Sequence, residues 1–140
     1  DQHTREMGVR MKLNPLNAII NGKKIALIDD SIVRGTTSKQ IIKTLFEAGA
    51  TEVHFLVSSP PVKYPDFYGI DTPKQDKLIA ATKSVKEIEE YLGATSLYYL
   101  SIEGLLASTE LDPNYFSTSC FTGEYPVDLL GRAGEVRVVS

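Results

Sequence analysis

Short apolar runs alternate with amphipathic segments along most of the chain. Residues 24–28, 53–57 and 96–100 are apolar runs of strand length, and the first predicts a parallel strand buried on both faces. Between the first two runs, apolar residues recur at helical spacing and predict a helix from about Thr37 that is capped by Gly49. The first two runs and this helix therefore predict a strand–helix–strand unit. The recurring apolar residues are Ile41, Ile42, Leu45 and Phe46.

Further helices are predicted on both sides of this unit. Residues 15–20, which begin with proline, predict a short helix, and residues 102–107 predict a short final helix. Thr72 and Pro73 are typical of an N-cap and a first helical residue. The intervening residues 58–72 are rich in proline and tyrosine and predict a long loop.

A capping box gives the sharpest local signal for a helix. Ser84 and Glu87 have the spacing at which each side chain accepts from the other residue's backbone N–H. The helix that follows is expected to end at Gly93. The alternation of strands and helices predicts an α/β fold with a Rossmann-like parallel sheet and helices on its faces.

The composition narrows the classes of function. The 140 residues have the length of one domain, and the net charge of −3 argues against a nucleic-acid partner. No apolar run approaches the roughly 20 residues of a membrane helix. Cys120 is the only cysteine, which excludes an internal disulfide and indicates a reducing, cytoplasmic compartment. One thiol and two histidines argue against a structural zinc site.

Two adjacent carboxylates follow the first apolar run. Asp29 and Asp30 fall at the carboxyl end of this strand, where open parallel sheets bind their ligands. Two neighbouring carboxylates repel each other, so a metal ion, a sugar diol or a nearby cation would relieve the repulsion. The acidic pair is therefore a candidate binding site for a hydroxylated or metal-bound ligand.

A glycine and several hydroxyl residues follow the acidic pair. Gly35 permits close approach of the backbone to a ligand, and the helix from about Thr37 offers its positive dipole end. Thr36, Thr37 and Ser38 add hydroxyl groups, so the segment predicts a phosphate cradle one loop away from the acidic pair. The simpler interpretation makes both aspartates turn residues and Thr36 an N-cap.

Response-regulator receivers also place an acidic pair after their first strand and use it to hold a metal ion. They require a phosphoacceptor aspartate at the end of a later strand. Here residues 53–57 lead into Ser-Ser-Pro-Pro, and residues 96–100 lead into Ser101. Neither segment supplies the acid, which disfavours this interpretation.

The nine residues 29–37, Asp-Asp-Ser-Ile-Val-Arg-Gly-Thr-Thr, resemble the phosphoribosyl pyrophosphate (PRPP) loop of type I phosphoribosyltransferases. Residue by residue, this segment is most similar to that of the glutamine-dependent amidophosphoribosyltransferases. Residues 9–15, 58–61, 68–71 and 120–126 also resemble segments of that family. The resemblance extends over most of residues 5–128.

The resemblance implies a partial domain, the C-terminal part of a type I phosphoribosyltransferase fold. Residues 1–16 would be the tail of a flexible active-site loop. Residues 17–110 would belong to the phosphoribosyltransferase domain, with its PRPP loop at 26–38. Residues 111–140 would form a C-terminal extension.

The resemblance also implies roles for individual residues. Asp29 and Asp30 would bind the ribose hydroxyls of PRPP and its Mg²⁺ ion. Arg10 and Lys12 would act in catalysis from the flexible loop, which closes over PRPP and excludes water. The residues expected to wrap the 5′-phosphate, mainly through backbone N–H groups, are Ser31, Ile32, Val33, Arg34, Gly35, Thr36 and Thr37.

The implied reaction is displacement of pyrophosphate from PRPP by ammonia, giving 5-phosphoribosylamine in the first step of de novo purine synthesis. The ammonia would come from a glutaminase domain outside this sequence, and these residues alone are expected to be inactive. Purine nucleotides are expected as feedback inhibitors, and a homo-oligomer as the assembly. Two alternatives stay open: another type I phosphoribosyltransferase acting on a nucleobase, and a non-catalytic regulator that senses PRPP.

Some members of the family carry a four-cysteine iron–sulfur cluster. Two of those cysteines would align with Asp66 and Ser117, and a third with Cys120. Four thiolates cannot be assembled here, so no iron–sulfur cluster is expected, and Cys120 is expected to be a small buried residue.

An exposed strand edge is expected at residues 24–28 or 53–57.

Overall fold

The computed structural model describes residues 17–139 of the chain, so Arg10 and Lys12 lie outside the described residues. The described part begins with helix α2 (Asn17–Ile20), which matches the end of the helix expected at 15–20. Within this part, no helix is long and apolar enough to cross a membrane.

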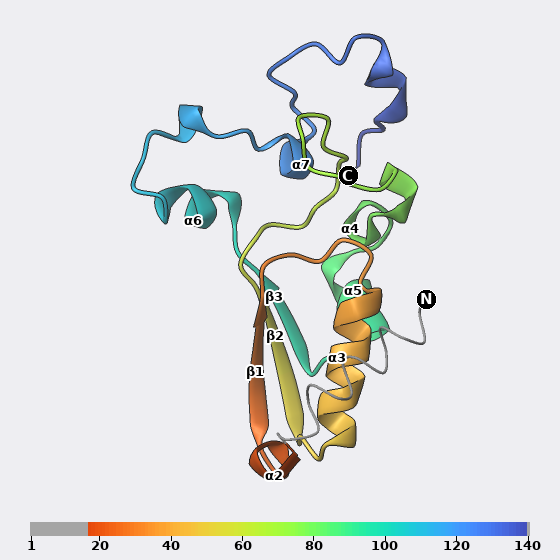
Figure 1. The fold of residues 1–140 in the computed structure, drawn as a ribbon, viewed down its shortest axis with the longest axis vertical. Coiled ribbons are helices and arrows are strands. Elements are labelled where there is room, and N and C mark those ends of the chain that lie inside the picture. Colours follow the sequence, from red (N-terminus) through yellow and green to blue (C-terminus); the bar gives the residue numbers. More distant parts are fainter. Residues whose placement is uncertain (1–16, 140) are drawn as a thin grey trace.

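Three parallel strands form the sheet, in the order β1-β2-β3 along it (Figure 1). The register pairs Asp29 with Val57 and Val57 with Tyr99, so all three strands end at the same edge. This confirms the predicted α/β fold with parallel strands. The strands are β1 (Lys24–Asp29), β2 (Glu52–Val57) and β3 (Ser96–Tyr99).

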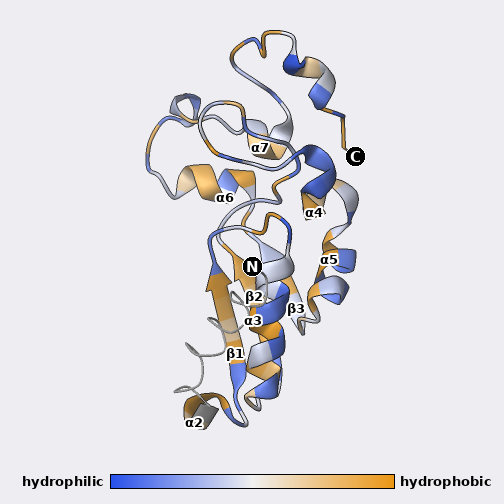
Figure 2. Cartoon of the chain, turned by 45° about the vertical axis from the view of Figure 1, so that its right-hand side comes forward, coloured by the Kyte–Doolittle hydropathy of each residue, from blue (hydrophilic) through white to orange (hydrophobic). Residues whose placement is uncertain are grey.

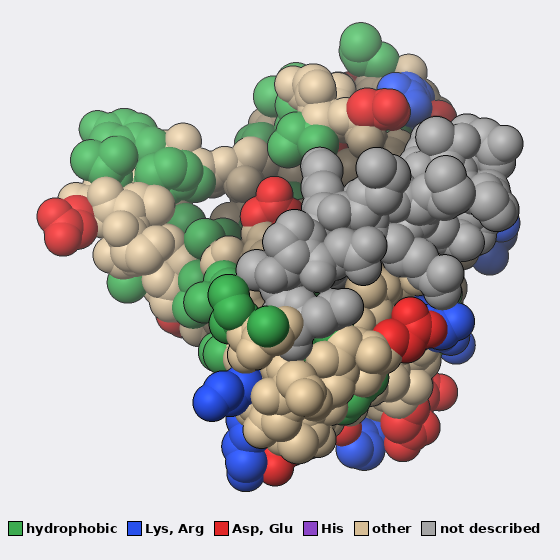
Figure 3. Space-filling model, turned by 60° about the horizontal axis from the view of Figure 1, so that its bottom comes forward, with side chains coloured by type: hydrophobic (Ala, Val, Ile, Leu, Met, Phe, Trp, Pro, Cys, Tyr) green, Lys and Arg blue, Asp and Glu red, His purple; other side chains and the backbone are tan. Residues whose placement is uncertain are grey.

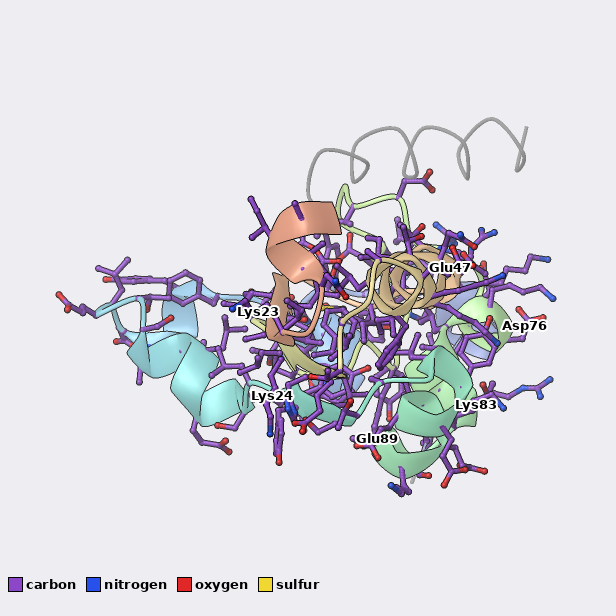
Figure 4. All side chains as sticks on the ribbon, turned by 90° about the horizontal axis from the view of Figure 1, so that it is seen from below. Lys23, Lys24, Glu47, Asp76, Lys83 and Glu89 are labelled. Atoms are coloured by element: carbon purple, nitrogen blue, oxygen red, sulfur yellow. The ribbon has the colours of Figure 1, made fainter. Side chains whose placement is uncertain are left out.

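Helices α3 (Thr36–Glu47) and α5 (Val85–Leu92) lie together on one side of the sheet, as the view along the strands shows (Figure 4). The described helices have polar and apolar positions side by side, whereas β1 and β2 are largely hydrophobic (Figure 2). The buried core is the layer between sheet and helices, and Phe55, Ile42 and Ile88 are at most 1% exposed in it.

The expectation that β1 is buried on both faces is wrong. Exposure alternates along β1, and among residues 17–139 cover is provided only on the face toward α3 and α5. On the opposite face, Ile28 is 70% exposed, Leu56 39% and Tyr98 63%. The sequence of a short apolar run does not show whether one face or both faces of the strand will be covered. The elements that pack against the strand decide this.

Local signals placed α3 and α5 correctly. Gly49 has φ 94°, and its N–H donates to the Phe46 carbonyl at 2.9 Å just after α3 ends. The predicted capping box of α5 is present, since Ser84 N–H donates to the Glu87 carboxylate at 2.8 Å and Glu87 N–H donates to the Ser84 hydroxyl. Gly93 ends α5 in the left-handed conformation.

The helix expected to start at Thr72 and Pro73 is wrong. A 3₁₀ turn, η2 (Gln75–Lys77), comes first, and α4 (Ile79–Thr82) follows. The Thr72 hydroxyl accepts a hydrogen bond from Asp66 N–H at 2.7 Å, so this threonine stabilises the preceding loop rather than a helix.

The C-terminal part of the chain projects beyond the carboxyl end of the sheet (Figure 1). Side-chain hydrogen bonds to backbone groups attach it to the loop after β2. The Tyr125 hydroxyl donates to the Pro65 carbonyl at 2.8 Å, and Gln75 donates to the Arg137 carbonyl at 2.8 Å. Its short helices are α6 (Ile102–Ala107), η3 (Pro113–Tyr115), α7 (Ser119–Thr122) and η4 (Arg132–Glu135).

Cys120 at α7 is half-buried rather than buried, so the expectation of a small buried residue is wrong. Burial, and then the nearby Asp66 carboxylate, raise the pKa of its thiol. The thiol is therefore a poor nucleophile at neutral pH.

Candidate functional site

The acidic pair lies at the carboxyl edge of the sheet, as predicted. Asp29 is the last residue of β1 and half-buried, and Asp30 follows it on the surface. One Asp29 carboxylate oxygen accepts from Asp30 N–H at 3.0 Å, and one Asp30 carboxylate oxygen accepts from the Ser31 hydroxyl at 3.1 Å. Within residues 17–139 neither carboxylate forms an ion pair, so both negative charges remain available to a ligand.

The neighbouring strand fixes the backbone of this pair. Ser58, which directly follows β2, donates to the Asp29 carbonyl through its N–H at 3.0 Å and its hydroxyl at 2.9 Å. Two donors on one carbonyl hold the end of β1 against the end of β2. Sequence reasoning did not assign Ser58 a role, although its position directly after a predicted strand was a usable signal.

The loop after the acidic pair is held in place by one core side chain and one backbone hydrogen bond. Ile32 is 1% exposed and belongs to the core between sheet and helices. The Val33 carbonyl accepts a hydrogen bond from Ile79 N–H at 2.9 Å, which joins the loop to the start of α4. These two contacts hold the underside of the loop, while the Arg34, Thr36 and Thr37 side chains are exposed.

Gly35 lies where the loop meets α3, and two constraints require glycine there. Its φ of 76° is in the left-handed region. A Cβ at this position would lie 3.0 Å from Ile79 Cδ1 and 3.3 Å from Tyr91 Cε1. On the next turn the Lys39 ammonium lies 4.1 Å from the centre of the Tyr91 ring, which further links α3 to α5.

The backbone N–H groups of this segment are unsatisfied. Those of residues 31–38 have no acceptor within residues 17–139, whereas the next one, from Lys39, donates to the Gly35 carbonyl at 2.9 Å. A left-handed residue followed by a helical turn aligns successive N–H groups as an anion-binding concavity. The dipole of α3 adds partial positive charge at the same point. The segment is therefore suited to a phosphate group.

The acidic pair also has donor atoms suited to Mg²⁺. This ion prefers oxygen ligands and is commonly held by one or two carboxylates together with the phosphates of its substrate. Within residues 17–139 there is no cluster of three or more residues of the types that bind metals. When the substrate supplies most of the metal ligands, the protein needs to contribute only one or two carboxylates. Asp29 and Asp30 can be these ligands.

A cavity of about 320 Å³ lies elsewhere, between Pro61, α4 and the start of α5. No residue of the 29–37 segment lines it. The candidate site is thus an open cradle at the sheet edge rather than part of this cavity.

No family model matches the chain, but curated proteins do. An amidophosphoribosyltransferase of Synechococcus elongatus is 59% identical over 126 residues, which are 90% of this chain and 26% of that protein. The Bacillus subtilis amidophosphoribosyltransferase is 48% identical over 134 residues, covering 91% of this chain and 28% of that protein. The chain therefore spans about a quarter of the length of these relatives.

Two solved structures resemble the fold. The B. subtilis glutamine PRPP amidotransferase complexed with ADP and GMP superposes with a TM-score of 0.76 and 48% identity, over 81% of this chain and 26% of that one. A structure of the allosteric regulatory enzyme of purine biosynthesis gives a TM-score of 0.77 and 43% identity, over 88% of this chain and 28% of the other.

Proposed function

This chain belongs to the amidophosphoribosyltransferase family over about 90% of its length, and we propose that its residues 26–38 bind PRPP at the transferase site of such an enzyme. The observation that carries the proposal is the set of unsatisfied N–H groups of residues 31–38 beside Asp29 and Asp30. PRPP requires both features, because its 5′-phosphate needs donors and its ribose hydroxyls need acceptors.

The N–H groups of residues 31–38 would bind the 5′-phosphate. The anchored underside of the loop keeps these donors in place before the ligand arrives, which lowers the entropy cost of binding. Most of these contacts would run through the backbone, and the Thr36 and Thr37 hydroxyls are the side-chain groups that would add to them.

Asp29 and Asp30 would accept hydrogen bonds from the two ribose hydroxyls and hold the Mg²⁺ that accompanies PRPP. The bound ion would neutralise charge on the departing pyrophosphate. The two carboxylates would lie beside the ribose ring, where positive charge develops as the bond at C1 breaks, and would stabilise that charge electrostatically.

The reaction assigned to the complete site is attack of ammonia on C1 of PRPP, which releases pyrophosphate and gives 5-phosphoribosylamine. Ammonia would be supplied from glutamine by polypeptide outside residues 1–140. Arg10 and Lys12 would neutralise the polyphosphate when the loop that carries them closes, and this closure would exclude competing water.

The regulation and the setting of this site are also proposals. Because the B. subtilis relative is complexed with ADP and GMP, purine nucleotides are the proposed inhibitors. A homo-oligomer is the proposed assembly. A reducing cytoplasm is the proposed compartment, and a single half-buried cysteine is compatible with it.

Calorimetric titration of PRPP with Mg²⁺ into the 140-residue chain tests the proposal. Saturable, Mg²⁺-dependent binding is expected, and the double variant Asp29→Asn/Asp30→Asn should weaken it at least about tenfold, a loss of ~1.4 kcal/mol. The matched control Asp71→Asn/Asp76→Asn removes two exposed carboxylates that lie outside residues 26–38 and should bind like the parent. Equal binding by both double variants, or no binding by a folded parent, contradicts the proposal.

A further inference from the structure

One peptide unit joins the two aspartates of the candidate site, and both of its hydrogen-bonding groups are occupied. Its carbonyl, from Asp29, accepts from the Ser58 N–H at 3.0 Å and from the Ser58 hydroxyl at 2.9 Å. Its N–H, from Asp30, donates to one Asp29 carboxylate oxygen at 3.0 Å. The atoms of a peptide unit lie in one plane with the two Cα atoms at its ends. The tilt of this plane therefore sets the directions in which both carboxylates leave the chain.

The two hydrogen bonds from Ser58 have different roles. The register pairs Asp29 with Val57, and the Ser58 N–H continues this ladder by one residue. The pairing of β1 with β2 is therefore complete without the Ser58 side chain. The hydroxyl adds a second donor to the same carbonyl, and two donors oppose rotation of the peptide plane more strongly than one. The side chain of Ser58 thus acts on the acidic pair rather than on the sheet.

Ser58 is itself held firmly by the strand that precedes it. Val57 is 3% exposed, and its carbonyl accepts from the Leu100 N–H at 2.9 Å. Pro60, two residues after Ser58, is buried as well. β2 is the central strand, so its end lies between the ends of β1 and β3 (Figure 1). A hydroxyl on this strand end can therefore hold the neighbouring peptide unit in a fixed position.

A ribose diol presents two hydroxyls on neighbouring ring carbons, so the distance between them is narrowly defined. Acceptors for such a pair bind best when their own separation is fixed before the ligand arrives. We propose that Ser58 is a positioning residue for the acidic pair. Its hydroxyl holds the peptide plane between Asp29 and Asp30 so that the two carboxylates accept from both ribose hydroxyls at once. This inference rests on the proposed function, because it assigns the diol of PRPP to these carboxylates.

Calorimetric titration of PRPP with Mg²⁺ into the 140-residue chain and its serine variants tests the inference. Ser58→Ala keeps the backbone N–H bond and should weaken PRPP binding at least about fivefold, the scale of one net hydrogen bond. Ser58→Thr retains the hydroxyl and should bind like the parent. Ser59→Ala is the matched control, because the hydroxyl of this neighbouring serine donates to the Pro60 carbonyl at 3.1 Å instead. It should also bind like the parent.

A second ligand separates positioning from a general structural effect. Inorganic phosphate has no diol and should bind only to the N–H groups of residues 31–38, which is followed by the NMR shifts of these amides. In Ser58→Ala its affinity should change by less than about twofold, and the midpoint of thermal unfolding should fall by no more than about 4 °C. Equal losses of affinity for PRPP and for inorganic phosphate would mean that the whole sheet edge has moved, and would overturn the inference.

The effect of Ser58 must also pass through the acidic pair. Added to Asp29→Asn/Asp30→Asn, Ser58→Ala should weaken PRPP binding by less than about twofold further, because the acceptors that it positions are already altered. The full loss in that background overturns the positioning role, and so does parent-like PRPP binding by Ser58→Ala. Absence of PRPP binding by the folded parent contradicts the proposed function itself, and this inference falls with it.

Discussion

The part of the chain before Tyr98 and the part after it are stabilised in different ways. Within residues 17–139, every buried apolar side chain lies in the first part, and Ser119 is the one buried residue of the second. The first part is a packed sheet and helix layer. The second part contains exposed apolar side chains, and Figure 3 shows hydrophobic groups gathered on its projecting end. The exposed apolar side chains of the second part include Leu111, Tyr115 and Phe116.

The difference shows why the candidate site lies on the first part. Burial of apolar side chains contributes several kcal/mol at each core position, whereas a typical hydrogen bond contributes about 1 kcal/mol net. The cradle needs backbone groups held in place without a ligand. Ile32 and Gly35 meet this need because both are packed against the core.

The largest contrast should come from deleting one aromatic ring in each part. Phe55→Ala empties a fully buried site in β2 and should cost about 3–5 kcal/mol of unfolding free energy. Tyr115→Ala removes a ring that is 78% exposed and should change stability by less than about 0.5 kcal/mol. Denaturant unfolding followed by circular dichroism measures both. Comparable losses would show that the second part is packed as tightly as the first.

Comparing Gly35→Ala with Gly22→Ala should separate the cost of a left-handed backbone from the cost of steric crowding. Gly35→Ala must accept a left-handed φ and a contact of 3.0 Å with Ile79, so a loss of roughly 2 kcal/mol and weaker PRPP binding are expected. Gly22→Ala is the matched control, because its φ is 74° and no atom lies within 4 Å of the added Cβ. It should cost only about 1 kcal/mol and leave binding unchanged. Thermal unfolding and PRPP titration distinguish the two variants.

Two serine caps offer a finer comparison. Ser84 caps α5, which packs in the core, and Ser101 caps α6 by accepting from Gly104 N–H at 3.0 Å. Ser84→Ala should lower the unfolding free energy by about 1 kcal/mol. Ser101→Ala should have a smaller effect on global unfolding, because α6 contains no buried residue. An equal effect would mean that α6 unfolds together with the core.

Local opening should be visible at Gln75. Its side-chain amide donates to the Arg137 carbonyl, and its side-chain oxygen accepts from Arg137 N–H at 2.7 Å. Gln75→Ala should accelerate hydrogen exchange at the Arg137 amide by about tenfold or more. The amides of β2 should keep their protection, and accelerated exchange there would show that the C-terminal segment stabilises the sheet.

The smallest expected effect is the pH dependence of the Lys24–Glu52 pair. Hydrogen bonds from Lys24 and then His54 lower the pKa of the Glu52 carboxyl from its ordinary 4.5. A lowered folded-state pKa stabilises the fold above the unfolded pKa, and this contribution is lost as the pH falls through the folded value. Glu52→Gln should thus be slightly less stable than the parent at pH 7 and equal to it in acid. A stability difference that is the same at both pH values would contradict this.

Much of the fold and part of the site were predictable from local patterns. The strands, α3 and the α5 capping box follow from signals within a few residues, such as the spacing of Ser84 and Glu87. The helix start at Thr72 was wrong because its hydroxyl binds Asp66 N–H instead. A side chain that bonds to a loop gives the same sequence signal as one that caps a helix.

The sequence by itself determined the order of strands and helices, the acidic pair at the end of β1 and the glycine before α3, because each depends on neighbours along the chain. Only the tertiary structure decided that Ser58 holds the Asp29 carbonyl and that Ile79 holds the loop. It also decided that, within residues 17–139, helices cover only one face of β1, whereas its apolar sequence had predicted cover on both faces. Burial depends on which elements pack together, and residues distant in sequence make those contacts.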